Sequence, residues 1–235
     1  TITSISPTTG TVCGGTPITI TGLNFQDGAT VIIDDAAPIT VTGGQVVEGT
    51  VIYATTNAGT VEAAGSDVIV SNPGGAGSDT LDNGYMYSAD ELSVSVDRDT
   101  VALGPVTAGT TIVSPVGEVV VVTNDSVCST TTLRLRILAD PAEWTSSITA
   151  QGMETYVLYA EFNSGQPGVG TFTKPNHGLT NADQDASGTK FAGDQTGQNV
   201  PASETRNLWF RFDAPTVTIR SAQGTITVRL TAISP

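Results

Sequence analysis

The chain has few basic side chains, few aromatic residues and no long apolar run. It carries 9 Lys and Arg against 23 Asp and Glu in 235 residues, which gives a formal net charge of -14 at pH 7. Such an acidic surface repels phosphate groups, so we predict no nucleic-acid partner. No apolar segment is long enough to cross a bilayer, so we predict no membrane span. The sequence begins with Thr and shows no signal-peptide pattern, which leads us to expect a processed secreted protein.

Residues suited to nucleophilic or acid–base catalysis are also scarce. The only histidine, His177, lies in the turn sequence KPNHGL, and we interpret it as a loop residue. A catalytic triad needs a base beside a nucleophile, and neither a Gly-x-Ser-x-Gly elbow nor a His-x-x-x-His pair occurs. We therefore expect that the protein is not an enzyme.

Glycine, proline and threonine are abundant, and the apolar residues alternate with polar ones in short runs. The 26 glycines and 12 prolines favour many turns, and the alternation is typical of half-buried strands. In the first part of the chain we expect strands at residues 2–6, 17–22, 30–34, 46–54, 67–71 and 84–87. The sequence thus predicts an all-β fold.

Five separated motifs in residues 1–88 occur in the order and spacing of one known domain family. They are ITSISPTTG, GGTPITITGLNF, GATVIID, DVIVSNPGG and GYMYS. This series resembles the IPT/TIG domain, an immunoglobulin-like β-sandwich. The resemblance implies that the segment GLNF forms a corner that places Phe25 in the core. Such domains occur in receptors, bacterial surface proteins and accessory modules of polysaccharide enzymes, so the fold alone does not define a role.

Residues 89–235 predict a second sandwich. Leu133, Leu135 and Ile137 alternate with Arg134 and Arg136. In the same way, we expect Leu208, Phe210 and Phe212 in the core and Trp209 and Arg211 outward. We expect strands at residues 92–96, 117–123, 132–139, 155–163, 207–213, 216–220 and 224–232. This part resembles immunoglobulin-like modules of predicted bacterial secreted and surface proteins. The predicted fold class is therefore two tandem immunoglobulin-like β-sandwich domains, with a long loop at about residues 164–206 in the second.

The long loop contains a spacing that is typical of calcium loops. Asp183, Asp185 and Ser187 are followed by a glycine and then by Asp194, which would place oxygen ligands at positions one, three, five and twelve. Calcium requires several oxygens that converge on one point. Two interpretations remain open: a calcium site, or an acidic loop that is simply solvated.

The charges are divided unevenly along the chain, because residues 1–97 contain eleven acidic side chains and no Lys or Arg. Four arginines of the second domain are expected to point outward: Arg134, Arg136, Arg211 and Arg229. Contacts of these arginines with the acidic domain of another copy would be head-to-tail and would build an open polymer. We therefore expect an extracellular, cell-surface structural subunit of a surface filament, pilus-like fibre or surface layer, with itself as partner.

An alternative function is a carbohydrate-binding or adhesive module with surface glycans as partners. Sugars stack on flat rings that lie beside polar groups. The candidate rings are Trp144, Tyr159 and Trp209, although rings of this kind also serve in cores and interfaces.

The two cysteines fall in different predicted domains. In an immunoglobulin-like sandwich, the turn that contains Cys13 and the turn that contains Cys128 would both lie at the junction of the domains. The resemblance therefore implies a Cys13–Cys128 disulfide, and the alternative is two separate thiols. The bond would close a long loop and would contribute about 4 kcal/mol in the chain-entropy model.

Peptide mapping without reductant tests this pairing. We expect a single disulfide-linked peptide that contains Cys13 and Cys128 and that separates into two peptides after reduction. Recovery of both cysteines as free thiols from protein alkylated under native and denaturing conditions would contradict the prediction.

Overall fold

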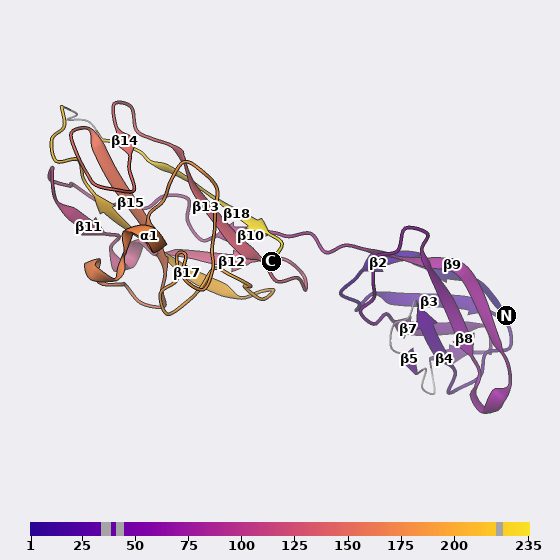
Figure 1. Ribbon diagram of the computed structural model, residues 1–235. Coiled ribbons are helices and arrows are strands. Elements are labelled where there is room, and N and C mark those ends of the chain that lie inside the picture. The colour runs from indigo at the N-terminus through magenta and orange to yellow at the C-terminus, as the bar shows by residue number, and fades with distance from the viewer. Residues whose placement is uncertain (34–38, 41–44, 220–222) are drawn as a thin grey trace. The chain divides into compact units, whose positions relative to one another are not determined.

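The computed structural model describes residues 1–33, 39–40, 45–219 and 223–235, and their regular secondary structure consists almost entirely of β-strands (Figure 1). The chain divides into two compact units, Thr1–Asp90 and Glu91–Pro235. The predicted all-β fold is confirmed. None of the helices in the described residues is long or apolar enough to cross a membrane.

The first unit consists of two sheets that enclose one core. One sheet has the order β1 (Ile2–Ser6), β3 (Pro17–Gly22), β7 (Val51–Thr55) and β6 (Val46–Val47). The other has the order β2 (Thr9–Thr11), β9 (Ser78–Ser88), β8 (Ser66–Ser71), β4 (Thr30–Ile33) and β5 (Ile39–Thr40). Alternate residues of these strands point inward and are buried, among them Ile20, Ile52 and Val68 at 0% exposure.

The corner after β3 forms as the sequence predicted. Phe25 is 6% exposed and belongs to the core, and Asn24 turns the chain with a φ of 63°. Gly22 is needed at this corner, because a Cβ there would lie 2.0 Å from the Thr1 carbonyl oxygen and 2.5 Å from the Phe25 ring. The close approach of the backbone explains the glycine better than turn propensity does.

Two strands of the first unit differ from the prediction. The strand expected at residues 46–54 is divided into β6 and β7, because Glu48 and Gly49 adopt φ values of 50° and 65° and form a tight turn. The strand expected at residues 84–87 is the end of the longer β9. Asp34, the expected end of another strand, lies outside the described residues.

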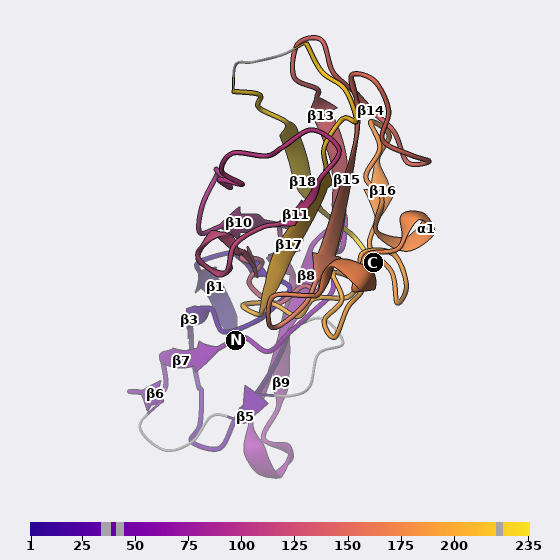
Figure 2. The ribbon, with the colours of Figure 1, turned by 90° about the vertical axis from the view of Figure 1, so that its left-hand side faces the viewer.

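The second unit also packs one sheet against another. The larger sheet has the order β10 (Val94–Val96), β12 (Val120–Asn124), β17 (Thr205–Asp213), β15 (Thr155–Phe162) and β14 (Thr145–Ser146), with β11 (Thr111–Val113) paired to β17. The smaller sheet has the order β16 (Gln184–Asp185), β13 (Thr132–Ala139) and β18 (Thr227–Ile233). Figure 2 shows β13 beside β18 and β15 beside β17.

Residues 216–220 do not form the expected strand. In the described part of this segment, only Val217 makes a single bridge, with Met153. Arg220 lies outside the described residues. The strand expected at 117–123 starts later, at Val120, because a 3-10 turn occupies Val116–Glu118.

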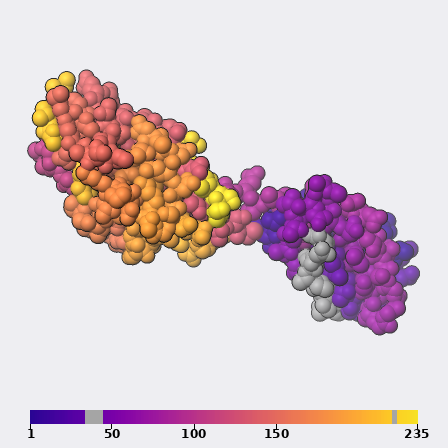
Figure 3. Space-filling model, in the orientation of Figure 1, coloured from indigo at the N-terminus to yellow at the C-terminus, as the bar shows by residue number. Residues whose placement is uncertain are grey.

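The long loop at residues 164–206 is structured and packs on the second unit. It contains the 3-10 turn Val169–Thr171, the single-turn helix α1 (Lys174–His177) and β16. Its side chains Leu179 and Phe191 are both 0% exposed and join the main core. Orange atoms, which include much of this loop, cover a large part of the face of the second unit seen in Figure 3. The loop therefore acts as an additional layer over the larger sheet.

Asn124, at the end of β12, fixes three segments of the second unit. Its side chain is buried, and its Nδ2 donates to the carbonyl oxygens of Ser129 and Val200 at 2.9 Å each. Its Oδ1 accepts the Ser126 N–H at 3.0 Å. The Asn-Asp-Ser glycosylation sequon that starts at Asn124 is therefore closed to an attached glycan in the folded protein.

Substitution Asn124→Ala tests this role. We expect a loss of about 2–4 kcal/mol in the free energy of unfolding, because the buried partners lose their hydrogen bonds. Urea unfolding measures the loss. The neighbouring exposed substitution Asp125→Ala is the control, and an equal effect of the two substitutions would contradict the assignment.

Candidate functional site

The outer face of the smaller sheet of the second unit carries three arginines, and we call it the arginine face. It consists of Arg134 and Arg136 of β13 and Arg229 of β18. The alternate residues of β13 are buried in the core, which forces these arginines outward. Arg136 lies directly opposite Arg229 in the antiparallel register of the two strands. The side chains of these three arginines thus lie on the outer face of the sheet.

Two aspartates of the long loop pair with the arginines of β13. Arg134 donates from Nε to Asp185 Oδ1 at 2.5 Å and from Nη2 to Asp185 Oδ2 at 3.1 Å. Asp183 lies 3.9 Å from Nη1 of Arg134 and 3.5 Å from Nε of Arg136. The hydrogen bond from Arg134 lowers the pKa of Asp185, and the same bond raises the pKa of Arg134. These partly exposed pairs hold the loop against β13 at a modest gain in stability.

The same contacts favour the second of the two interpretations of this spacing, an acidic loop without a calcium site. Asp183 and Asp185 face guanidinium groups, and Ser187 Oγ accepts the Lys190 N–H at 2.9 Å. Asp194 accepts the N–H of Ser164 at 2.6 Å and also its hydroxyl, which lowers the pKa of Asp194. Among the described residues, the three carboxylates do not gather as ligands of one ion. Asp183 and Asp185 face the arginines of β13, whereas Asp194 is bonded to Ser164 of the loop itself.

Arg229 differs from the other two arginines of the arginine face. It is exposed, and it forms no ion pair with any residue that the structure describes. The arginine face thus combines three arginines with two aspartates. It is a locally positive surface in a chain whose net charge is -14.

Arg211 is not available to a partner in the way the sequence predicted. Its guanidinium donates to Asp213 Oδ1 at 2.8 Å and Oδ2 at 2.9 Å, and it lies 4.7 Å from the centre of the Tyr159 ring. It also donates to the Val169 carbonyl oxygen of the long loop at 2.9 Å. Only 17% of its side chain is exposed. Arg211 therefore fastens the loop to the larger sheet.

Of the three candidate rings for stacking on sugars, two are buried and one is half-buried. Tyr159 and Trp209 are 1% and 3% exposed and pack with Phe172 of the long loop. Trp144 is half-buried and stacks on Phe212, with ring centres 6.0 Å apart. Trp209 does point away from the main core, as predicted, but the loop covers it. For Tyr159 and Trp209 the structure thus favours the alternative role in packing, which the sequence had left open.

Glu161 and His177 are buried under the long loop. Glu161 is 2% exposed and accepts a hydrogen bond from Thr171 Oγ1 at 2.8 Å. Burial raises the pKa of Glu161, and the hydrogen bond from Thr171 opposes this shift. His177 accepts the Thr173 N–H at 2.9 Å through Nδ1, and its Nε2 lies 3.1 Å from the Ala192 carbonyl oxygen. Both ring nitrogens of His177 thus serve to hold the loop.

Cys13 and Cys128 lie in loops of different units. Cys13 is half-buried between β2 and β3, and Cys128 is exposed between β12 and β13. Their pairing stays a prediction.

The strand β18 is an edge of the smaller sheet. On β13, the N–H groups of Leu133 and Ile137 donate to carbonyl oxygens of the long loop, on the side away from β18. Successive residues of a strand direct their backbone groups to opposite sides, so the N–H and C=O groups of Arg134 and Arg136 point to β18. The alternate residues of β18 therefore turn their N–H and C=O groups away from β13. These residues are Val228, Leu230 and Ala232. Within the described part of the chain, no hydrogen bond to these outward groups is found.

The edge position of β18 could not be predicted from the sequence, because the alternation of residues in a strand does not reveal which strands lie beside it. One signal was present, namely the arginine in the middle of the strand, Arg229. A charged residue at the centre of a strand is a common device on exposed edges.

The raised pKa of Glu161 generates a prediction about stability and pH. A carboxyl group whose pKa is higher in the folded state stabilises the fold fully below its unfolded pKa of about 4.3, and this contribution is lost as the pH rises through the folded pKa. At pH 7 the buried charge is a cost. We expect Glu161→Gln to raise the melting temperature by about 2–5 °C at pH 7 and to have little effect near pH 4.

Calorimetric or fluorescence melting curves across this pH range measure the effect. Glu143→Gln is the control, because Glu143 is exposed. A lower melting temperature of Glu161→Gln at pH 7 would show that the ionised carboxylate is favourable.

Comparisons with known proteins agree with the fold of the first unit. Residues 1–85 match the model of the IPT/TIG domain family. No curated protein matches the chain. Among solved structures, domains CD of another protein cover 98% of this chain and 98% of their own at 13% identity, but the TM-score of 0.25 does not establish a shared fold. Residues 1–85 are therefore an IPT/TIG domain, an immunoglobulin-like module of the general kind found in surface and adhesion proteins.

Proposed function

We propose that the protein is a structural, non-catalytic subunit of an extracellular assembly that grows by contacts between copies. The observation that carries this proposal is the exposed edge of β18. A seven-residue strand with outward N–H and C=O groups is a template for pairing with another strand. Soluble monomers usually protect such an edge.

The other edges of the second unit are much shorter. β10, β14 and β16 have three, two and two residues, and short edges offer few hydrogen bonds to a partner. β18 contains no proline, and Arg229 is the one charged residue along it. Among the described edge strands of this unit, β18 is therefore best suited to pairing.

The first unit offers a matching edge. β1 has five residues and pairs with β3 alone, whereas the other edge strands, β2, β5 and β6, have two or three residues. Pairing of β18 of one copy with β1 of the next copy joins unlike surfaces. Contacts of this head-to-tail kind form open chains when the rotation between copies does not close a ring.

Charge supports the same pairing. The arginine face lies on the sheet that ends in β18, and Arg229 has no intramolecular ion pair among the described residues. The first unit contains no Lys or Arg. Attraction between these surfaces would speed association and disfavour contacts between two first units, while the strand pairing would supply most of the affinity.

Two further observations favour a non-catalytic, extracellular role. The only histidine uses both ring nitrogens to hold the long loop, and buried Glu161 is bonded to Thr171 beneath that loop. The IPT/TIG fold of residues 1–85 is common in extracellular proteins. We propose on these grounds that the assembly lies at the cell surface.

The substitution Ala232→Pro tests the proposal. Proline at this position removes an outward N–H group but leaves the hydrogen bonds between β18 and β13 in place, and edge strands tolerate proline. We expect the native chain to form filaments or larger oligomers at high concentration, and Ala232→Pro to remain monomeric. Light scattering with negative-stain electron microscopy measures both.

The control is Ala232→Val, which keeps the N–H group and should assemble like the native chain. The melting temperature of each variant verifies its fold. A native chain that stays monomeric at high concentration across a range of salt would refute the assembly. Filaments of Ala232→Pro that equal those of the native chain would refute the role of β18.

A further inference from the structure

We propose that the outer face of the sheet β1-β3-β7 in the first unit binds an uncharged carbohydrate chain, with Tyr53 as the ring on which a sugar stacks. This site is separate from the arginine face and from the β18 edge.

Tyr53 is the only exposed aromatic residue of the protein. The chain has five Tyr, six Phe and two Trp, and all of them lie in described segments. Tyr53 is 52% exposed, Trp144 and Phe210 are half-buried, and the others are buried. An exposed ring on a sheet removes little apolar area from water, so packing within the unit does not account for it.

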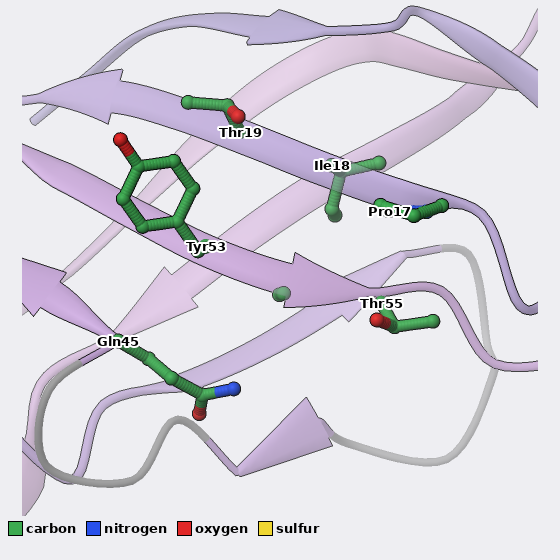
Figure 4. A pocket seen from close by; sticks show the side chains of 7 residues that line it. Pro17, Ile18, Thr19, Gln45, Tyr53 and Thr55 are labelled. Atoms are coloured by element: carbon green, nitrogen blue, oxygen red, sulfur yellow. The ribbon is translucent and has the colours of Figure 1, made fainter.

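The ring lies on a surface built from three strands. In the register of the sheet, Tyr53 of β7 is opposite Thr19 of β3, and Thr19 is opposite Ser6 of β1. Figure 4 shows the Tyr53 ring pointing from β7 toward Thr19. Beside the ring is a shallow hollow of about 260 Å³, slightly smaller than typical ligand pockets. Its lining is Pro17, Ile18, Thr19, Gln45, Tyr53, Ala54 and Thr55.

The hydroxyl groups around the ring are free to bind a ligand. Ser6 and Thr55 are exposed and Thr19 is half-buried, and their hydroxyls form no hydrogen bond to other residues in the described part of the chain. A hydroxyl group both donates and accepts hydrogen bonds, which suits the hydroxyl groups of a sugar. A flat ring flanked by such groups matches the alternation of apolar and polar faces on a pyranose.

The charge of this surface selects the class of sugar. The outward residues of the three strands carry no charge; they are Ser4, Ser6, Pro17, Thr19, Thr21, Val51, Tyr53 and Thr55. The surrounding unit is acidic and has no Lys or Arg. The acidic unit therefore repels uronic acids, sulfated sugars and nucleotides, and it favours an uncharged carbohydrate chain.

The experiment uses the full chain with amide NMR and a panel of neutral oligosaccharides, namely maltohexaose, cellohexaose, xylohexaose and mannohexaose. Oligogalacturonate serves as the anionic comparison. We expect at least one neutral probe at millimolar concentration to shift amides of β3 and β7 around Tyr53. Tyr53→Ala should weaken this binding by about tenfold or more, and Tyr53→Phe should stay within about threefold of the native chain, because it keeps the ring.

Val61→Ala is the matched control, since Val61 is 57% exposed in the same unit and lies outside the hollow. Binding to Val61→Ala should equal binding to the native chain. The proposal is wrong if no neutral probe causes shifts, if Tyr53→Ala binds as well as the native chain, or if oligogalacturonate binds more tightly than every neutral probe. Shifts caused only by a Tyr-rich peptide would identify a protein partner instead and would also overturn it.

Discussion

The burial of one apolar sheet face against another is the interaction on which the rest of this structure depends. Each fully buried Ile or Leu contributes about 1.5–3 kcal/mol, and both units have many such residues between their sheets. Because side chains alternate along a strand, the residues that fill the core also determine which residues must face outward. The arginine face, the covered Trp209 and the exposed Tyr53 are all consequences of this alternation.

The outer sheet faces of the two units differ in whether a loop covers them. In the second unit the long loop covers the outer face of β15 and β17, and every polar group trapped there requires a partner. Arg211 is bonded to Asp213, Glu161 to Thr171, and Trp209 donates from Nε1 to the Asn163 carbonyl oxygen at 2.7 Å. In the first unit no described segment covers the outer face of β1, β3 and β7, and Tyr53 is 52% exposed there. The covered face is structural, and the open face is where a ligand has access.

The strands and the inward residues could be predicted from the sequence, because period-two alternation is a local signal. The alternation in the segment VIYAT also predicts that Tyr53 points outward, because Ile52 and Ala54 on either side of it are buried. What could not be predicted was the path of the long loop. The alternation correctly turned Trp209 away from the main core, but only the fold shows that Phe172 lies over it. From the sequence, the spacing of Asp183 and Asp185 fitted a calcium loop as well as an acidic loop. Only the register of β16 with β13 shows that arginines lie beside these aspartates.

The arrangement of charge around β18 gives a physical reason why this edge suits an acidic neighbour. Arg136 and Arg229 lie directly opposite each other, and like charges in that position cost about 0.2–1 kcal/mol. Asp183 offsets the charge of Arg136, but within the described residues no carboxylate does the same for Arg229. A second arginine edge would add to the repulsion, so pairing of two β18 strands is disfavoured. A strand from the first unit, which has no Lys or Arg, adds no such repulsion. Arg229 therefore disfavours pairing of two β18 strands and favours the head-to-tail contact.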